Sequence, residues 1–167
     1  MAAFVLTAET ILLGTAWTGT APGLPGTQTV AGTITSTSDI STYVKSVSGP
    51  GWDIATVDTT NMGSGGYTAM IAGLTSGKPM SFDANSDLAA SQLHSIIFTT
   101  LGGPSRPGSS PVYIDIKATS AARSATNPSF VAAVLLTDVA SFTGSVGDRA
   151  QSAFTLTVTG AFGFLTS

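Results

Sequence analysis

The chain has 167 residues, enough for one domain with a substantial hydrophobic core. Only 9% of its residues are charged, against about 25% in an ordinary soluble domain, and its polar surface relies on 26 Thr and 21 Ser. The net charge is −3 and the six Lys and Arg residues are scattered, which argues against a surface that grips nucleic acid. The absence of cysteine excludes disulfides, a thiol nucleophile and thiolate metal sites.

This composition favours assembly. Hydroxyl groups carry no net charge, so they cost less to remove from water than Lys or Glu side chains. A chain of this kind can bury much of its exterior against copies of itself, although a secreted binding module also fits a low charge. No run reaches the roughly 18 apolar residues of a membrane span, and the N-terminal segment lacks the positive region of a signal peptide.

The first third of the chain has strand and turn patterns. Phe4–Leu13 is strand-like, and the Gly-, Thr- and Pro-rich segment Gly14–Ser38 is predicted to be a long loop or arm that carries short strands. Ile40–Val47 is a strand candidate, Gly49–Gly51 makes a turn, and Trp52–Thr60 is again extended.

A hairpin-type loop is predicted next. Gly63–Gly66 is its flexible part, and no Lys-Ser or Lys-Thr follows it, which excludes a phosphate-binding loop. We expect Met70, Ile71 and Leu74 to return the chain to the core.

One helix is predicted, over Asp83–Leu101. At about 100° per residue, one face carries the apolar side chains of Ala89, Leu93, Ile96, Ile97 and Leu101. Asn85, Ser86 or Asp87 can cap its first turn, and Gly102–Pro104 ends it. A helix with one apolar face is expected to bury that face against a sheet.

Two loops flank the next strand. The loops are Gly102–Pro111 and Ser120–Ser129, both rich in turn-forming residues. Between them, Val112–Ala118 alternates, so that Val112, Ile114 and Ile116 face one side and Tyr113, Asp115 and Lys117 the other.

Two long strands close the chain. Val131–Gly160 is predicted to form them around a turn at Gly147–Asp148, with the last strand ending at Gly160. The clearest alternation of the sequence lies here, with three threonines between Phe154, Leu156 and Val158.

Two segments carry a family resemblance. In Thr56–Gly77 the motif VDTT, a Gly-rich loop, Tyr67 and an apolar pair precede a short strand, and Val131–Gly160 supplies a closing strand pair. In this order around one helix, they resemble the major tail tube proteins of long-tailed, siphovirus-type bacteriophages. The resemblance implies a mainly β fold, a β-sandwich or partly closed β-barrel with one flanking α-helix, in a single tail tube domain over residues 1–167.

The resemblance also implies a function. The chain is expected to be a structural subunit that forms stacked hexameric rings, with the sheets of neighbours joined around a lumen that conducts double-stranded DNA during ejection without binding it specifically. Its partners are then other copies and the tail proteins at the tube ends, with no membrane. It is expected in the virion tail after assembly in the host cytoplasm, and to be no enzyme, with no cofactor and no metal.

Two sets of residues are candidates for this function. The candidates for contacts between subunits are Trp17, Met62, Tyr67, Leu88 and Phe98, of which the last two fall outside the main helical stripe. The candidates for the lumen are the carboxylates Asp53, Asp58, Asp115 and Asp138, because repeated negative potential keeps a polyanion centred.

A calcium loop is weighed and set aside. Asp83, Asn85 and Asp87 match D-x-N-x-D, but Leu88 replaces the sixth-position Gly and His94 the bidentate Glu. Helix capping therefore explains these residues better. His94 is the single histidine and no G-x-S-x-G motif accompanies it, so a structural or interface role is favoured over catalysis.

One alternative function stays open. A secreted or surface β-sandwich that binds carbohydrate or mediates adhesion would place aromatic side chains on one exposed, coplanar face. The candidates are Trp17, Tyr43, Trp52, Tyr67 and Tyr113.

Overall fold

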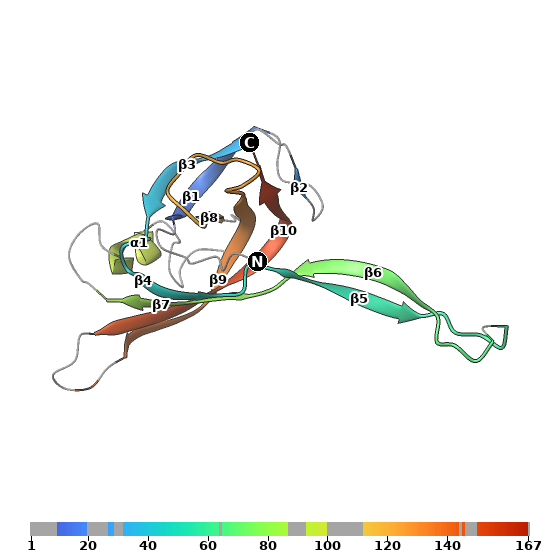
Figure 1. The fold of residues 1–167 in the computed structure, drawn as a ribbon. Helices are drawn as coiled ribbons and strands as arrows, with labels where there is room; N and C mark the ends of the chain where they lie inside the picture. The colour runs from blue at the N-terminus through green and yellow to red at the C-terminus, as the bar shows by residue number, and fades with distance from the viewer. Residues whose placement is uncertain are drawn as a thin grey trace.

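The computed structural model describes residues 10–19, 27–28, 32–63, 65–86, 93–99, 112–143, 145 and 150–166. Over these residues the fold is mainly β with one short helix, as predicted (Figure 1). An eight-stranded sheet has the order β3-β1-β8-β9-β10-β7-β4, with β2 beside β10, and β5 and β6 form a separate two-stranded sheet. No helix in the described part of the chain is long and apolar enough to cross a membrane.

The elements are short in the first half and long at the end. The strands of the large sheet are β1 (Thr10–Gly19), β2 (Thr27–Gln28), β3 (Gly32–Asp39), β4 (Val44–Ser48), β7 (Met80–Asn85), β8 (Val112–Lys117), β9 (Ser129–Thr143) and β10 (Gln151–Leu165). The small sheet is made of β5 (Trp52–Asp58) and β6 (Met70–Gly77), and the helix is α1 (Leu93–Thr99). The strands pair in antiparallel fashion except β2, which runs parallel to β10.

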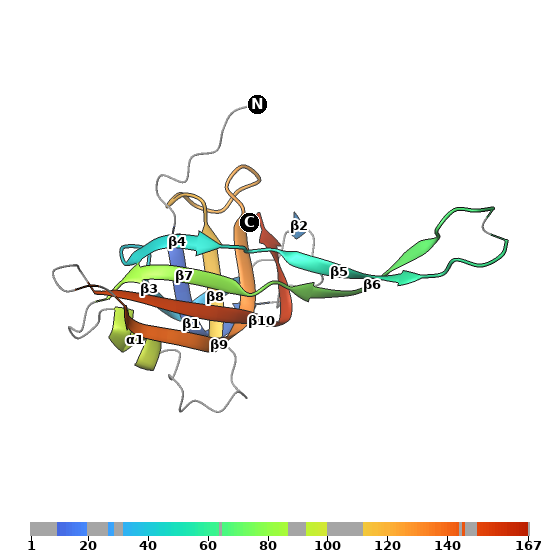
Figure 2. The same ribbon diagram turned by 90° about the horizontal axis from the view of Figure 1, so that it is seen from below.

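The large sheet bends over its own core. β1, β3 and β8 lie across from β4, β7 and β10, and α1 lies at one side of this half-closed arrangement (Figures 1 and 2). Large side chains from both halves fill the space between them, and the rings of Phe82 and Phe154 stack at 4.8 Å. Each fully buried side chain of this size stabilises the fold by about 1.5–3 kcal/mol.

Alternation along the strands explains which face is buried. In β7 and over residues 152–156 of β10 every second residue is buried, among them Phe82, Phe154 and Leu156, as a pleated strand with one apolar face requires. In β8 the predicted set of Val112, Ile114 and Ile116 is buried. The periodicity of the sequence therefore predicted the buried face of β8 and of the first part of β10, whereas β7 was not predicted from it.

The segment Gly14–Ser38, predicted as a loop or arm carrying short strands, consists of strands in its described parts. Residues 14–19 continue β1 and residues 32–38 belong to β3, and the two strands pair with each other. Gly14 allows the strands to approach, because a Cβ there would lie 2.0 Å from Cγ2 of Ile34. Trp17 lies in the same way over Gly32. The glycines that suggested a loop thus serve close packing between strands.

The predicted helix is too long at its N-terminal end. Asp83–Asn85 completes β7, because the alternation of Met80, Phe82 and Ala84 places three side chains in the core. The backbone N–H of Asn85 donates to Tyr43 O, so Asn85 belongs to the sheet.

The helical stripe itself is confirmed where it is described. Leu93, Ile96 and Ile97 are buried on α1. The remaining predictions for this region fall outside the described residues: Asp87, Leu88, Ala89, Leu101, Gly102–Pro104 and the loop Gly102–Pro111.

Two strand boundaries also differ from the prediction. β4 begins at Val44 rather than Ile40, because Ser41 turns the chain by donating its N–H and hydroxyl to Asp39 Oδ1. β10 does not end at Gly160 but continues to Leu165, and Gly160 adopts φ 77° at an irregularity in the pairing with β9. The predicted turn Gly147–Asp148 falls outside the described residues.

Candidate assembly surface

The hairpin of β5 and β6 projects away from the body of the molecule (Figures 1 and 2). Every residue of β5 is exposed, and β6 is exposed over most of its length. Among the described strands, the two pair only with each other. A two-stranded hairpin in this position is marginally stable alone and leaves two backbone edges available for pairing.

Most of the exposed apolar surface of the described chain lies on this hairpin. Eight of the nine exposed large apolar side chains belong to it: Trp52, Ile54, Val57, Met62, Tyr67, Met70, Ile71 and Leu74. Leu74 is 86% exposed, so the prediction that Met70, Ile71 and Leu74 return to the core is wrong. A concentration of apolar side chains of this kind marks an interaction surface.

The apolar side chains occupy both faces of the hairpin. Directly paired residues share a face, so the pairs Trp52–Gly77, Ile54–Thr75, Thr56–Ala72 and Asp58–Met70 define one face, here called the Trp52 face. The register shift between Ile54 and Thr56 adds a residue to β6 and none to β5, so Val57 and its partner Ile71 lie on the opposite side. This other face carries Val57, Ile71 and Leu74 and is called the Leu74 face. Covering only one face would leave the other in water, so we expect the hairpin to lie between two surfaces.

The tip of the hairpin is held by side-chain turns. The N–H of Thr60 donates to Asp58 Oδ1 at 2.7 Å, and that of Gly63 donates to Asn61 Oδ1 at 2.8 Å. The Thr60 hydroxyl, followed by the Thr60 N–H, lowers the pKa of Asp58, because both stabilise the charged carboxylate. Met62 and Tyr67, two predicted contact residues, are exposed in this turn region.

The other predicted contact residues lie elsewhere. Trp17 is half-buried on β1 and its ring lies 6.0 Å from that of Tyr113. Phe98 is exposed on α1 and packs against the His94 ring at 4.4 Å, whereas Leu88 falls outside the described residues. Of the predicted contact residues that the structure describes, Trp17 and Phe98 therefore lie on other elements than the hairpin that carries Met62 and Tyr67.

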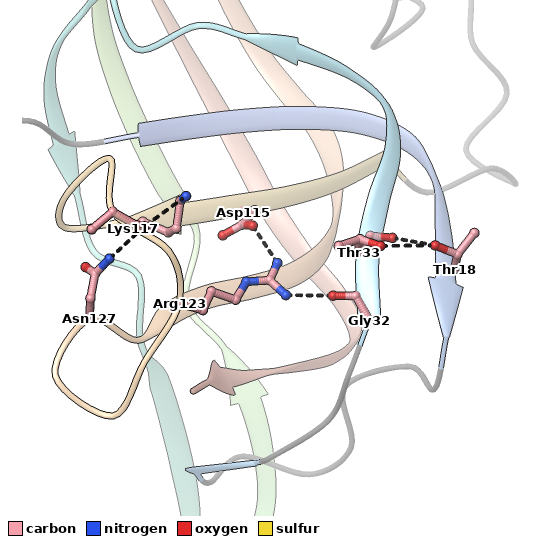
Figure 3. A network of polar contacts seen from close by, with 8 residues as sticks. Thr18, Gly32, Thr33, Asp115, Lys117, Arg123 and Asn127 are labelled. Carbon is pink, nitrogen blue, oxygen red and sulfur yellow. Dashed lines mark hydrogen bonds and ion pairs between the residues drawn. The ribbon is translucent and has the colours of Figure 1, made fainter. Parts of the chain in front are cut away.

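A buried ion pair joins Arg123 to Asp115, outside the hairpin (Figure 3). Arg123 Nη2 lies 2.6 Å from Asp115 Oδ2, and the side chains are only 13% and 5% exposed. Arg123 Nη1 also donates to Gly32 O at 2.6 Å, which ties the segment after β8 to the start of β3. Asp115 differs from the sequence-based expectation, because it is covered and neutralised rather than free. The pair fastens a loop, and Asn127 steadies the same loop by donating to Ala121 O.

The other predicted luminal carboxylates are exposed but scattered. Asp53 forms a 3.0 Å ion pair with Lys78 at the base of the hairpin, and Asp58 lies toward its tip. Asp138 lies on β9, on the surface opposite the core.

Asp138 belongs to a row of polar side chains that crosses four strands. Ser48, Ser81, Thr155 and Asp138 are successive register partners on β4, β7, β10 and β9. Hydroxyl contacts link neighbouring members of this surface, such as Ser81 with Thr155 at 3.4 Å and Thr137 with Thr157 at 3.0 Å. Together with Ser46 and Asp83, which are hydrogen bonded at 2.7 Å, these residues form what we call the hydroxyl face. The row was not predicted, because the strand order is not visible in the sequence.

No protein-family model and no curated protein sequence matches the chain. Solved structures do match it. A chain of the virion of a native gene transfer agent particle superposes with a TM-score of 0.53 at 15% identity, covering 77% of this chain and 88% of that one. A chain of the tail of an empty gene transfer agent particle, of C6 symmetry, gives 0.52 at 16% identity, with 73% and 81% covered.

A third match is more extensive. A chain of the six-fold symmetrised baseplate of the anti-feeding prophage gives a TM-score of 0.64 at 10% identity, covering 99% of this chain and 97% of that one. The chain therefore shares its fold with chains of these particles and of this baseplate. Because the baseplate match spans almost the whole chain, the hairpin is part of this shared fold.

Proposed function

We propose that this protein is a structural subunit of a phage-type tail tube, and that its copies join into six-membered rings that stack. The observation that carries the proposal is the projecting hairpin, which holds eight of the nine exposed large apolar side chains of the described residues. The C6 symmetry of one assembly with a similar chain, and the six-fold symmetrised baseplate with another, support the same arrangement here.

The occupant of the hairpin surface is a second copy of this chain. The Trp52 face and the Leu74 face are both apolar, and the Asp53–Lys78 pair at the base is locally neutral, so the hairpin fits a charge-poor surface. With 9% charged residues, another copy offers such a surface. The end strands β3 and β4 of the large sheet offer edges for pairing between neighbours within a ring.

The proposed role of the tube is to conduct double-stranded DNA without holding it. The hydroxyl face supports this role, because the row from Ser48 to Asp138 offers hydroxyls and a carboxylate but no cation for phosphates. On this proposal the protein acts in the virion tail after assembly in the host cytoplasm, contacts other tail proteins at the tube ends and has a mechanical rather than an enzymatic function.

The carbohydrate-binding alternative has weaker support. It requires aromatic side chains on one exposed plane. Trp17 and Tyr113 are half-buried and tilted by 37°, Trp52 packs against Phe162, and Tyr67 lies near the hairpin tip. These positions do not form a common platform.

Shortening the hairpin tests the proposal. Ile54 and Thr75 are directly paired, so residues 55–74 can be replaced by a two-residue Asn-Gly turn that leaves the base intact. We expect the full chain to sediment as six-copy particles and their multiples as concentration rises. The shortened chain should stay monomeric with an unchanged circular dichroism spectrum and unfolding temperature. A full chain that remains monomeric into the millimolar range, or a shortened chain that assembles equally well, would contradict the proposal.

A further inference from the structure

The hairpin is joined to the body through a backbone joint. The pairing of β4 with β7 ends at Ser48–Ser81, and the pairing of β5 with β6 begins at Trp52–Gly77. Between these pairs lie Gly49, Pro50 and Gly51 on one strand and Lys78, Pro79 and Met80 on the other. Gly49 has φ 77°, and the prolines have no N–H to donate to a ladder. One hydrogen bond, from Lys78 N–H to Gly51 O at 3.0 Å, crosses this joint. The backbone alone therefore does not fix the direction of the hairpin.

Side chains fix the direction of the hairpin at the first residue pair beyond the joint. The Trp52 ring lies 6.2 Å from the ring of Phe162 and 6.0 Å, edge-on, from that of Phe164, both on the last part of β10. Phe130 of β9 packs against the same two rings, at 6.3 Å and 5.4 Å. Phe130 and Phe162 belong to the core, so Trp52 is anchored to the rigid part of the molecule.

The partner of Trp52 on the other strand is held at the same level. A Cβ on Gly77 would lie 2.4 Å from Cγ1 of Val158, so the backbone of β6 lies directly on β10. The ion pair between Asp53 and Lys78 also crosses the joint, but its side chains are 68% and 48% exposed, and a pair of this exposure contributes little. The aromatic contacts are the stronger restraint.

We propose that Trp52 is a positioning residue, which docks on Phe162 and Phe164 and thereby sets the angle of the whole hairpin against the body. A small rotation at the joint moves the tip by a large distance, because the hairpin extends well beyond the body (Figure 2). If the hairpin docks on a second copy, as in the proposed function, a fixed angle lowers the entropy cost of docking. The angle itself is a property of the monomer.

The monomer can therefore be tested independently of assembly. The sequence has no cysteine, so spin labels can be placed at Met62→Cys near the tip and Thr137→Cys on β9 without background labelling. Double electron–electron resonance on dilute monomer then gives the distance distribution between tip and body. We expect a narrow distribution for the parent chain and one at least twice as wide for Trp52→Ala. Trp52→Phe should restore the narrow form, because it retains a ring.

The matched control is Ile54→Ala, which lies on the same face one pair further out and is half exposed. It should leave the distribution narrow. If Trp52→Ala fails to fold, Trp52→Leu takes its place, because leucine keeps apolar bulk without a ring. We expect Trp52→Leu to broaden the distance distribution to the same extent. A broad distribution in the parent chain overturns the proposal, as does a narrow one in the Trp52→Ala or Trp52→Leu variant, or equal broadening in Ile54→Ala.

The same variants separate this inference from the proposed function. If both hold, Trp52→Ala raises the concentration needed for assembly by at least tenfold and Trp52→Phe restores it. If the parent chain never assembles, the proposed function fails while the distance measurement still decides the role of Trp52.

Discussion

The most informative perturbation replaces two β-branched apolar side chains of the hairpin by threonine. Val57 and Ile71 face each other across β5 and β6 and are 50% and 56% exposed. Burying a whole side chain of this size contributes about 1.5–3 kcal/mol, so covering the exposed half contributes about 1 kcal/mol each. The double variant Val57→Thr/Ile71→Thr should therefore weaken each docked hairpin by about 2 kcal/mol, which is roughly a 30-fold rise in the concentration needed for assembly.

Threonine is also β-branched, so the strands should keep their conformation. The assay is analytical ultracentrifugation across concentration, with chemical unfolding of the dilute monomer beside it. The matched control is the exchange Val57→Ile/Ile71→Val, which keeps the apolar groups of this directly opposed pair and should assemble like the parent. The monomer's free energy of unfolding should change by less than about 1 kcal/mol in both variants, as is usual for exposed positions. Unchanged assembly of the double-threonine variant, or equal loss in the control, would refute docking through the Leu74 face.

Three further predictions concern charges. Arg123→Ala leaves the buried Asp115 carboxylate without its partner, so chemical unfolding should show a loss of about 3–5 kcal/mol, and a loss below 1 kcal/mol would contradict a buried pair. The lowered pKa of Asp58 means that its contribution to the hairpin turn is present above the pKa of the unfolded chain and is lost as pH falls through the folded value. The amide NMR signal of Thr60 should report this change at a pH below the ordinary range of an aspartate, and a midpoint within that range would argue against the hydrogen bonds. Thr155→Lys adds a cation to the hydroxyl face, so assembled tubes should gain salt-sensitive affinity for duplex DNA; tubes that bind no DNA would argue against a luminal position.

The local periodicity of apolar residues predicted several elements of the fold. Val112, Ile114 and Ile116 were predicted to share a buried face, and so were Phe154 and Leu156, because period-two alternation depends only on neighbouring residues. The stripe of Leu93, Ile96 and Ile97 was predicted for the same reason. Propensity failed where tertiary packing decided the outcome. Asp83–Asn85 resembled a helix cap but completes a strand between β4 and β10.

The candidate surface was harder to predict, for a physical reason. Met70, Ile71 and Leu74 have the pattern of core residues, and an apolar pattern is the same whether its own chain or another copy covers it. The direction in which a chain leaves its body depends on long-range contacts such as Trp52 with Phe162. Asp115 shows the same limit. Its place on β8 was predicted, but its cover comes from Arg123, which returns over the strand after a turn.

Cryo-electron microscopy of the purified protein at high concentration tests the central claim most directly. The account predicts stacked rings of six copies in which the density for residues 52–77 is buried against a neighbouring copy on both the Trp52 face and the Leu74 face. Monomers alone, or assemblies in which the hairpin extends freely into solvent, would contradict it.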